Sequence, residues 1–259
     1  MRVKIWLLIL CANHSLFPSK KKLNFFQDSD DSYDFNDHEA LPTPKNFDDH
    51  HGTRCAGQVA AGKNNACGIG IAYESKVAGV RILSGPITDI DEAAALNYGF
   101  QNVSIYSCSW GPPDNGRSME GPGYLINKAV VNGVNNGRGG KGSIFVFASG
   151  NGAAHGDQCN FDGYTNSIYS VTVSAVDYKG LHPYYSESCA ANMIVAYSSG
   201  DGKHIVSQLL PLTPSRFDQI LRLQLTKEKI HVQRPMEEPL RRLLMLSEYL
   251  PSHYKLGSS

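Results

Sequence analysis

SIFVFASGNG, residues 143–152, joins an apolar run to a polar turn that contains two glycines. Residues 143–148 have the length and the aromatic and β-branched side chains of a buried strand. The turn places Asn151 at the carboxyl end of that strand, where glycine permits positive φ and lets a substrate come close. A side-chain amide in this position can donate to a developing oxyanion. Taken alone, the stretch favours an ordinary turn asparagine.

Short apolar runs alternate with helical stretches on both sides of this strand. Further strands are predicted at 76–83, 103–110 and 168–176, and helices at 87–99 and 124–136, the first of them opened by Thr88 and Asp89. Strands that alternate with helices of about 10 to 15 residues predict a parallel sheet covered on both faces. In such sheets function lies at the carboxyl ends of the strands. The acidic, turn-rich segment 23–49 is expected to be a surface loop.

Composition excludes several classes of function. Lysine plus arginine and aspartate plus glutamate each number 24 among the 259 residues, so no basic excess favours nucleic acid or an anionic membrane. No stretch approaches the roughly 18 apolar residues of a membrane helix, so no membrane segment is expected in this chain. The six cysteines form no CxxC pair, which excludes zinc-ribbon and thioredoxin-like sites.

The N-terminal segment 1–23 has two interpretations. Arg2 and Lys4 precede the apolar run 5–10, and the small residues Cys11 and Ala12 follow it, which is the outline of a secretory signal peptide. The alternatives are a β-strand of the fold or an aberrant start of the gene. The residues by themselves leave these open.

Two other kinds of motif carry chemistry. DDHHGTRCAG, residues 48–57, places His51 before glycine and small residues, which suits a base at a helix N-terminus that packs closely on a sheet. SCSWGPPDNGR, residues 107–117, and GDQCNFDGYTNSIYSV, residues 156–171, put carboxylates in loops beside predicted strands. Each motif alone is more commonly a structural histidine or a set of solvated loop acids.

Five motifs taken in order strongly resemble the kexin and furin family, the subtilisin-like proprotein convertases of the peptidase S8 type. They are HGTRCAG (51–57), GVRILSG (79–85), IYSCSWGP (105–112), SIFVFASGNG (143–152) and CNFDGYTNSIYSVTV (159–173). The resemblance covers residues 24–207 as a partial peptidase domain. It implies an α/β fold of the three-layer subtilisin type, with a mostly parallel central sheet that is incomplete at both ends.

The resemblance also implies an activity. Members of this family are calcium-dependent serine endopeptidases of the secretory pathway, in the Golgi or outside the cell, which cleave precursors after paired basic residues. The expected partners are polybasic peptides or proproteins and an inhibitory prodomain. By the same resemblance His51 is the general base and Asn151 the oxyanion-hole donor.

Acidic residues of this chain match those that line the substrate cleft of the family. Asp114 and Asp162 match the pocket for a P1 arginine. Carboxylates in such a pocket hold the guanidinium by charge-assisted bonds. The remaining matches are Asp48 and Asp49 for a basic P2 residue, and Glu92, Glu120 and Asp89 for the rim near P4.

The resemblance assigns metal ligands and a disulfide as well. Calcium is matched by three acids: Asp114, Asp157 and Glu187. Hard oxygen ligands suit calcium rather than zinc. Cys159 and Cys189 match a disulfide of the family. A second calcium site would use Asn65, and the nearby Cys67 matches half of a disulfide whose other half is not found in this sequence.

Two members of the catalytic triad have no match. No Asp-Asp-Gly turn precedes His51, and no Gly-Thr-Ser-Ala segment follows Ser207. The tail 208–259 is unrelated to the family and is expected to be disordered or mis-spliced. The chain is therefore expected to be inactive, either as a fragment of the gene product or as a pseudoenzyme that binds basic peptides through its acidic cleft.

One further motif fits none of these roles. Asn102-Val103-Ser104 is a glycosylation sequon. It directly precedes a predicted buried strand, which argues against modification.

Overall fold

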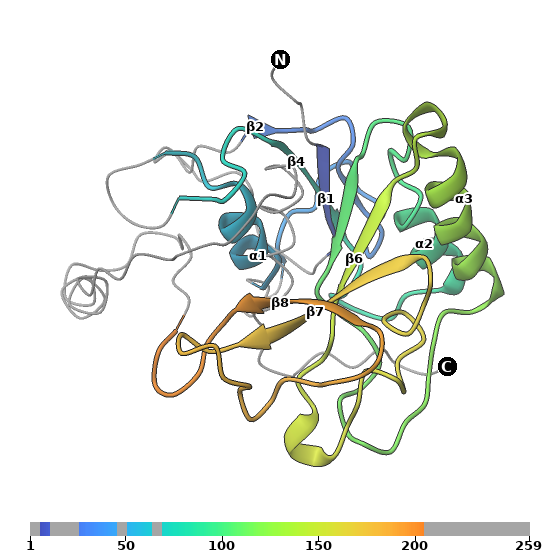
Figure 1. The fold of residues 1–259 in the computed structure, drawn as a ribbon. Coiled ribbons are helices and arrows are strands. Elements are labelled where there is room, and N and C mark those ends of the chain that lie inside the picture. The colour runs from blue at the N-terminus through green and yellow to red at the C-terminus, as the bar shows by residue number, and fades with distance from the viewer. Residues whose placement is uncertain (1–5, 11–25, 46–50, 64–68, 205–259) are drawn as a thin grey trace.

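The computed structural model describes residues 6–10, 26–45, 51–63 and 69–204. Within these residues one parallel sheet of eight strands runs in the order β2-β4-β1-β5-β6-β7-β8, with β3 also paired to β4 (Figure 1). The strands are β1 Trp6–Leu10, β2 Phe26–Gln27, β3 Tyr33–Asp34, β4 Lys76–Arg81, β5 Ile105–Cys108, β6 Ile144–Ala148, β7 Ser170–Val176 and β8 Asn192–Tyr197. The helices are α1 His51–Ala60, α2 Asp89–Ala95 and α3 Tyr124–Gly140, with a 3-10 turn η1 at Ala153–His155.

Most of the predicted elements are confirmed. β4, β5, β6 and β7 lie in the four predicted strand segments, and α2 begins after the N-cap Thr88, whose side chain accepts the Asp91 N–H. Regular helical angles in α3 end before Gly137, where the predicted helix also ends. β8 is an addition that the sequence does not predict.

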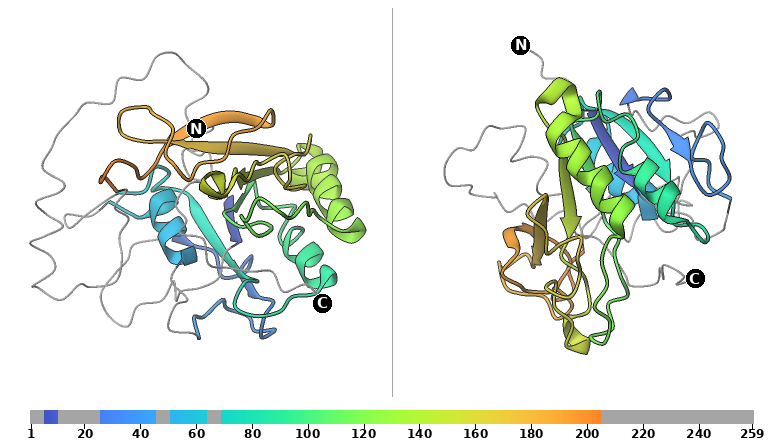
Figure 2. Two further views of the ribbon diagram at one scale, coloured as in Figure 1. Left: turned by 90° about the horizontal axis from the view of Figure 1, so that it is seen from below. Right: turned by 90° about the vertical axis from the view of Figure 1, so that its right-hand side faces the viewer.

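Helices cover both faces of the sheet and make three layers (Figures 1 and 2). Successive side chains of a strand point to opposite faces. Tyr106 and Phe145 accordingly stack, 4.6 Å between ring centroids, in the core cluster that also contains residues of α2 and α3. Their neighbours Ile105 and Val146 belong to the opposite cluster, which contains residues of α1. The predicted α/β fold, a parallel sheet with helices on both faces, is confirmed.

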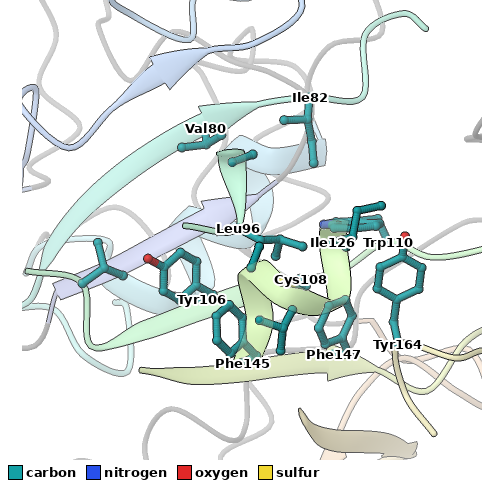
Figure 3. Close-up of a cluster of buried hydrophobic side chains, with 14 of the residues drawn as sticks. Val80, Ile82, Leu96, Tyr106, Cys108, Trp110, Ile126, Phe145, Phe147 and Tyr164 are labelled. Atoms are coloured by element: carbon teal, nitrogen blue, oxygen red, sulfur yellow. The ribbon is translucent and has the colours of Figure 1, made fainter. Parts of the chain in front are cut away.

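Aromatic packing at one end of the larger cluster fixes two loops (Figure 3). Trp110, just beyond β5, meets the rings of Phe147 at 5.7 Å and Tyr164 at 5.1 Å between centroids. Tyr164 belongs to the loop before β7. The loops that follow β5 and precede β7 are therefore held together by a buried contact.

The apolar run near the N-terminus forms β1. It pairs in parallel with β4 on one side and β5 on the other, near the middle of the sheet. Of the interpretations that the residues left open, the structure shows the strand. No helix in the described part of the chain is long and apolar enough to cross a membrane.

The acidic segment 26–45 is not a plain surface loop, and the sequence-based expectation is wrong here. Asp34 is fully buried, and its two oxygens accept bonds from Arg81 of β4 at 3.1 and 2.8 Å. Arg81 also pairs with the partly exposed Asp37. The composition of the segment suggests exposure, because the arginine that pairs with Asp34 lies 47 residues further along the chain.

Candidate functional site

Three acidic side chains converge where loops leave the carboxyl ends of the strands. Asp114 follows β5, Asp157 follows β6 and η1, and Glu187 lies between β7 and β8. One ligand oxygen from each lies within 4.8 Å of those of the other two. Asp157 and Glu187 are buried. Parallel strands deliver these loops to one edge of the sheet, which is why residues 73 positions apart meet.

Backbone N–H groups orient the three carboxylates. Three bonds of 2.8 Å run from Asn151 to Asp114, from Gly116 to Asp157 and from Gly152 to Glu187. Gly150 has a φ of +106°, and a Cβ atom there would lie 2.4 Å from Glu187 Oε1. The turn after β6 therefore requires glycine, because its backbone passes directly over an acid.

The cluster is electrostatically strained without a cation. Burial, with added repulsion from Asp114 and Asp157, raises the pKa of Glu187 to about 8. Burial also raises the pKa of Asp114. No lysine or arginine in the described ranges forms an ion pair with any of the three. A bound cation would offset both the repulsion and the cost of desolvation.

Asp162 extends this acidic group. Desolvation raises its pKa to about 7, with further repulsion from Asp114, although its Oδ1 accepts the Tyr164 N–H at 2.7 Å. A Cβ atom on Gly111 would lie 2.9 Å from Asp162 Oδ2. A backbone bridge between Glu120 and Asp162 holds the two loops side by side. Asp162 therefore packs closely against the backbone of Gly111, just beyond β5.

Tyr164 connects this group to α2. Its hydroxyl donates to Glu92 Oε1 at 2.6 Å while its ring packs against Trp110 (Figure 3). Glu92 is buried, and desolvation raises its pKa to about 7. Asp89 and Glu120, matched with Glu92 to the P4 rim, are exposed. Sequence reasoning does not single out Tyr164; an aromatic residue two positions after Asp162 is the signal that could have found it.

His51 is the first residue of α1, as the sequence predicts. Its side chain is buried, and Cys55 Sγ lies 3.6 Å from its Nε2 one turn further along the helix. Cys55 and Ala56 pack into the cluster beneath α1. Small side chains thus let the helix sit close to the sheet, which places the imidazole at the helix N-terminus with a thiol beside it.

Comparisons with known proteins identify the family. The sequence model described as the subtilase family matches residues 11–219, which is most of the chain. The chain belongs to the subtilase family. Kexin of Candida albicans is 60% identical over 184 residues, which cover 71% of this chain and 19% of that protein. Human proprotein convertase subtilisin/kexin type 7 is 52% identical over 174 residues, 66% of this chain and 22% of that protein.

This subtilase also has structural relatives. The serine protease of Aeromonas sobria, solved in complex with its chaperone, aligns with a TM-score of 0.65 and 18% identity, covering 78% of this chain and 38% of that one. That likeness shows the shared fold. The chain spans about a fifth of the length of the two curated relatives above.

The three-acid cluster of this subtilase fits calcium. Calcium–oxygen distances of about 2.3–2.6 Å separate two ligand oxygens by at most about 5 Å. The oxygens of Asp114, Asp157 and Glu187 meet that limit, since all lie within 4.8 Å of one another. All three are hard oxygen donors, which favours calcium over zinc. The backbone carbonyls and water that complete such sites are not specified by this cluster.

The disulfide between Cys159 and Cys189 is present. The sulfurs are 2.00 Å apart, and the bond closes a loop of 30 residues with both Cα atoms 5.4 Å apart. Cys159 lies two residues after Asp157, and Cys189 two residues after Glu187. The bond therefore ties together the two loops that carry these acids.

Some predicted residues cannot be placed. Asp48, Asp49, Asn65 and Cys67 lie outside the described residues, as does the segment 208–259. Their predicted roles stay predictions.

Proposed function

We propose that this chain forms the substrate cleft of a calcium-dependent serine endopeptidase of the proprotein convertase type, which cleaves secretory precursors after paired basic residues. The observation that carries the proposal is the pair Asp114 and Asp162. Both are largely desolvated, both have a raised pKa, and within the described residues neither has a cationic partner. A P1 guanidinium would supply the missing charge at Asp162, beside Asp114, and a neutral side chain would leave Asp162 unpaired.

The remaining side chains would act around the bound peptide. His51 would take the proton of an attacking hydroxyl, and the Asn151 amide would donate to the oxyanion that forms. Calcium, held by Asp114, Asp157 and Glu187, would neutralise these acids and fix the loops that carry them. An inhibitory prodomain with a basic end would occupy the same cleft.

The 259-residue chain has the cleft but no match to the nucleophilic serine or the orienting aspartate. We therefore expect it to bind basic peptides without cutting them, which is also how a pseudoenzyme would act. In subtilisin itself, loss of the serine or the histidine alone lowers kcat by about 2 × 10⁶, which sets the scale of the loss expected here. With calcium and a fluorogenic Arg-Lys-Arg substrate, the chain should give a flat trace. Turnover that His51→Ala abolishes would show that an unrecognised nucleophile is present.

Peptide binding tests the cleft directly. Isothermal titration in calcium with a peptide ending in Lys-Arg should detect binding to the parent, and Asp162→Asn should weaken it about 10- to 100-fold by removing one charge-assisted bond. Asp201→Asn is the matched control, because Asp201 is an exposed acid paired with Lys179 and the substitution makes the same change in net charge. Equal affinity of Asp162→Asn and the parent would refute the proposed cleft.

A further inference from the structure

The sequon Asn102-Val103-Ser104 has no part in the cleft, and the structure removes the argument against its use. Asn102 is exposed, although Val103 beside it is fully buried. The N–H groups of both residues bond to the Gly99 carbonyl at 2.8 Å, so Asn102 ends a tight turn after α2 rather than entering β5. The buried strand β5 itself begins only at Ile105.

The side-chain amide of Asn102 has a hydrogen that a substituent could replace. Its Nδ2 donates to both oxygens of Asp31, at 3.4 and 3.3 Å, and therefore to a single carboxylate. An amide nitrogen carries two hydrogens. An N-linked sugar replaces one of them and leaves the other to bond Asp31. The bonds to Asp31 are longer than the usual N–H···O distance.

Neighbours of Asn102 also hold the turn, through bonds that do not involve its side chain. Gln101 accepts the Gly139 N–H at 2.8 Å and donates to the Asn136 carbonyl at 3.1 Å. The Arg138 N–H donates to the Phe100 carbonyl at 3.0 Å. These bonds attach the turn to the end of α3, and a sugar on Asn102 would leave all of them in place.

The position of Asn102 in the sheet also keeps a sugar away from the acidic cluster. Asn102 precedes the amino end of β5, whereas Asp114 follows the carboxyl end of the same strand. A bulky sugar on Asn102 would therefore project from the edge of the sheet opposite the acidic cluster.

We propose that Asn102 is an N-glycosylation site, occupied when the chain enters the secretory pathway. The proposal rests on the secretory location included in the proposed function. A sugar there would cover the turn after α2 and leave the cleft open to peptides.

The experiment tests glycosylation of Asn102 separately from the secretory location of the protein. The full chain is fused to a cleavable leader and translated with endoplasmic-reticulum microsomes, and Asn13→Gln removes the one other sequon, Asn13-His14-Ser15. Entry into the lumen is scored by protection from added protease. Protected chain should show one shift in gel mobility that an N-glycosidase removes. Asn102→Gln and Ser104→Ala should lose the shift, and Ser104→Thr, which keeps the sequon, should retain it.

Each outcome of this experiment either supports or overturns glycosylation at Asn102. Protected chain without a shift, or a shift that survives Asn102→Gln, overturns the proposal. A second measurement tests accommodation in the fold: the Lys-Arg peptide should bind the glycosylated and the enzymatically deglycosylated chain with affinities within twofold, and weakening of about tenfold or more by the sugar would overturn the stated geometry. Failure of the leaderless chain to enter microsomes would count against the secretory location alone.

Discussion

Replacing Glu187 by glutamine should remove most of the calcium dependence of the stability of the folded chain, together with the part of its pH dependence that comes from Glu187. Without calcium, the folded state holds a proton on Glu187 up to a pKa of about 8, whereas the unfolded chain releases it near the ordinary value of 4.5. The folded state then binds more protons than the unfolded state, so the free energy of unfolding falls as pH rises from about 4.5 to about 8. The stabilisation is fully present below pH 4.5 and lost above pH 8.

The magnitude follows from the two pKa values. The gap between 4.5 and about 8 corresponds to about 5 kcal/mol at about 1.4 kcal/mol per pKa unit, an upper bound because loops relax around an ionised group. Calcium bound at the proposed site would remove the penalty by pairing with the ionised carboxylate, and it would add stability in proportion to the logarithm of its concentration over its Kd. The calcium effect should therefore be small at pH 5 and largest near pH 8.

Urea unfolding at pH 5, 6.5 and 8, with calcium or with a chelator, measures these quantities. Asp162 and Glu92, each with a pKa raised to about 7, further lower the free energy of unfolding as pH rises from about 4 to 7. The decisive quantity is therefore the difference between the free energies of unfolding in calcium and in chelator. In Glu187→Gln that difference should shrink to less than about a quarter of the parent value at pH 8. A parent curve in chelator that is flat from pH 5 to 8, or an undiminished calcium effect in Glu187→Gln, would refute the reasoning.

Two further predictions concern stability. Reduction of the Cys159–Cys189 bond, or alanine at both positions, should lower the free energy of unfolding by about 3–4 kcal/mol for a loop of this length, measured by urea unfolding with and without reductant; no change on reduction would contradict the pairing. Asp34→Asn should cost about 3 kcal/mol or more, because it leaves Arg81 buried with one of its two carboxylate partners removed. Asp37→Asn, which removes the solvent-exposed partner of the same arginine, should cost clearly less. Equal losses in the two variants would show that the burial of Asp34 is not what makes the pair matter.

The sequence predicts the parts of the fold that local pattern determines. β4 and β6 are short apolar runs between turn residues, and α2 has a capping threonine followed by acids in its first turn. β8 escapes prediction because its sequence, NMIVAY, exposes every second side chain to solvent, with Met193 and Val195 more than half exposed. Apolar residues on both faces give no alternation from which a strand could be recognised.

β1 cannot be decided from sequence for a different reason. A central parallel strand and the apolar part of a signal peptide are both short runs without charge, so composition alone cannot separate them. The burial of Asp34 is equally invisible, because it depends on Arg81, which only the folded sheet brings alongside. Long-range pairing, not local preference, determines both.

The candidate site also contains residues that the sequence groups in advance and contacts that it does not predict. Asp114, Asp157 and Glu187 can be grouped in advance through resemblance, because their loops follow recognisable motifs. The hydrogen bond from Tyr164 to Glu92 cannot, since 72 residues separate the two and neither motif implies the other. What the sequence lacks in each such case is the distance between loops, which the sheet topology supplies.

The placement of β1 affects how the chain can fold during synthesis. Its neighbours in the sheet are distant in sequence, since Leu7 pairs with Val77 on one side and with Ile105 on the other. At about 5–20 residues per second, the ribosome needs roughly 5–20 s after making β1 to complete β5. Until β4 is made, one of the most apolar segments of the chain has no strand partner, and until β5 is made it lacks its second. The nascent protein therefore depends on chaperones or on early collapse for protection, and its folding should be slow for a domain of this size.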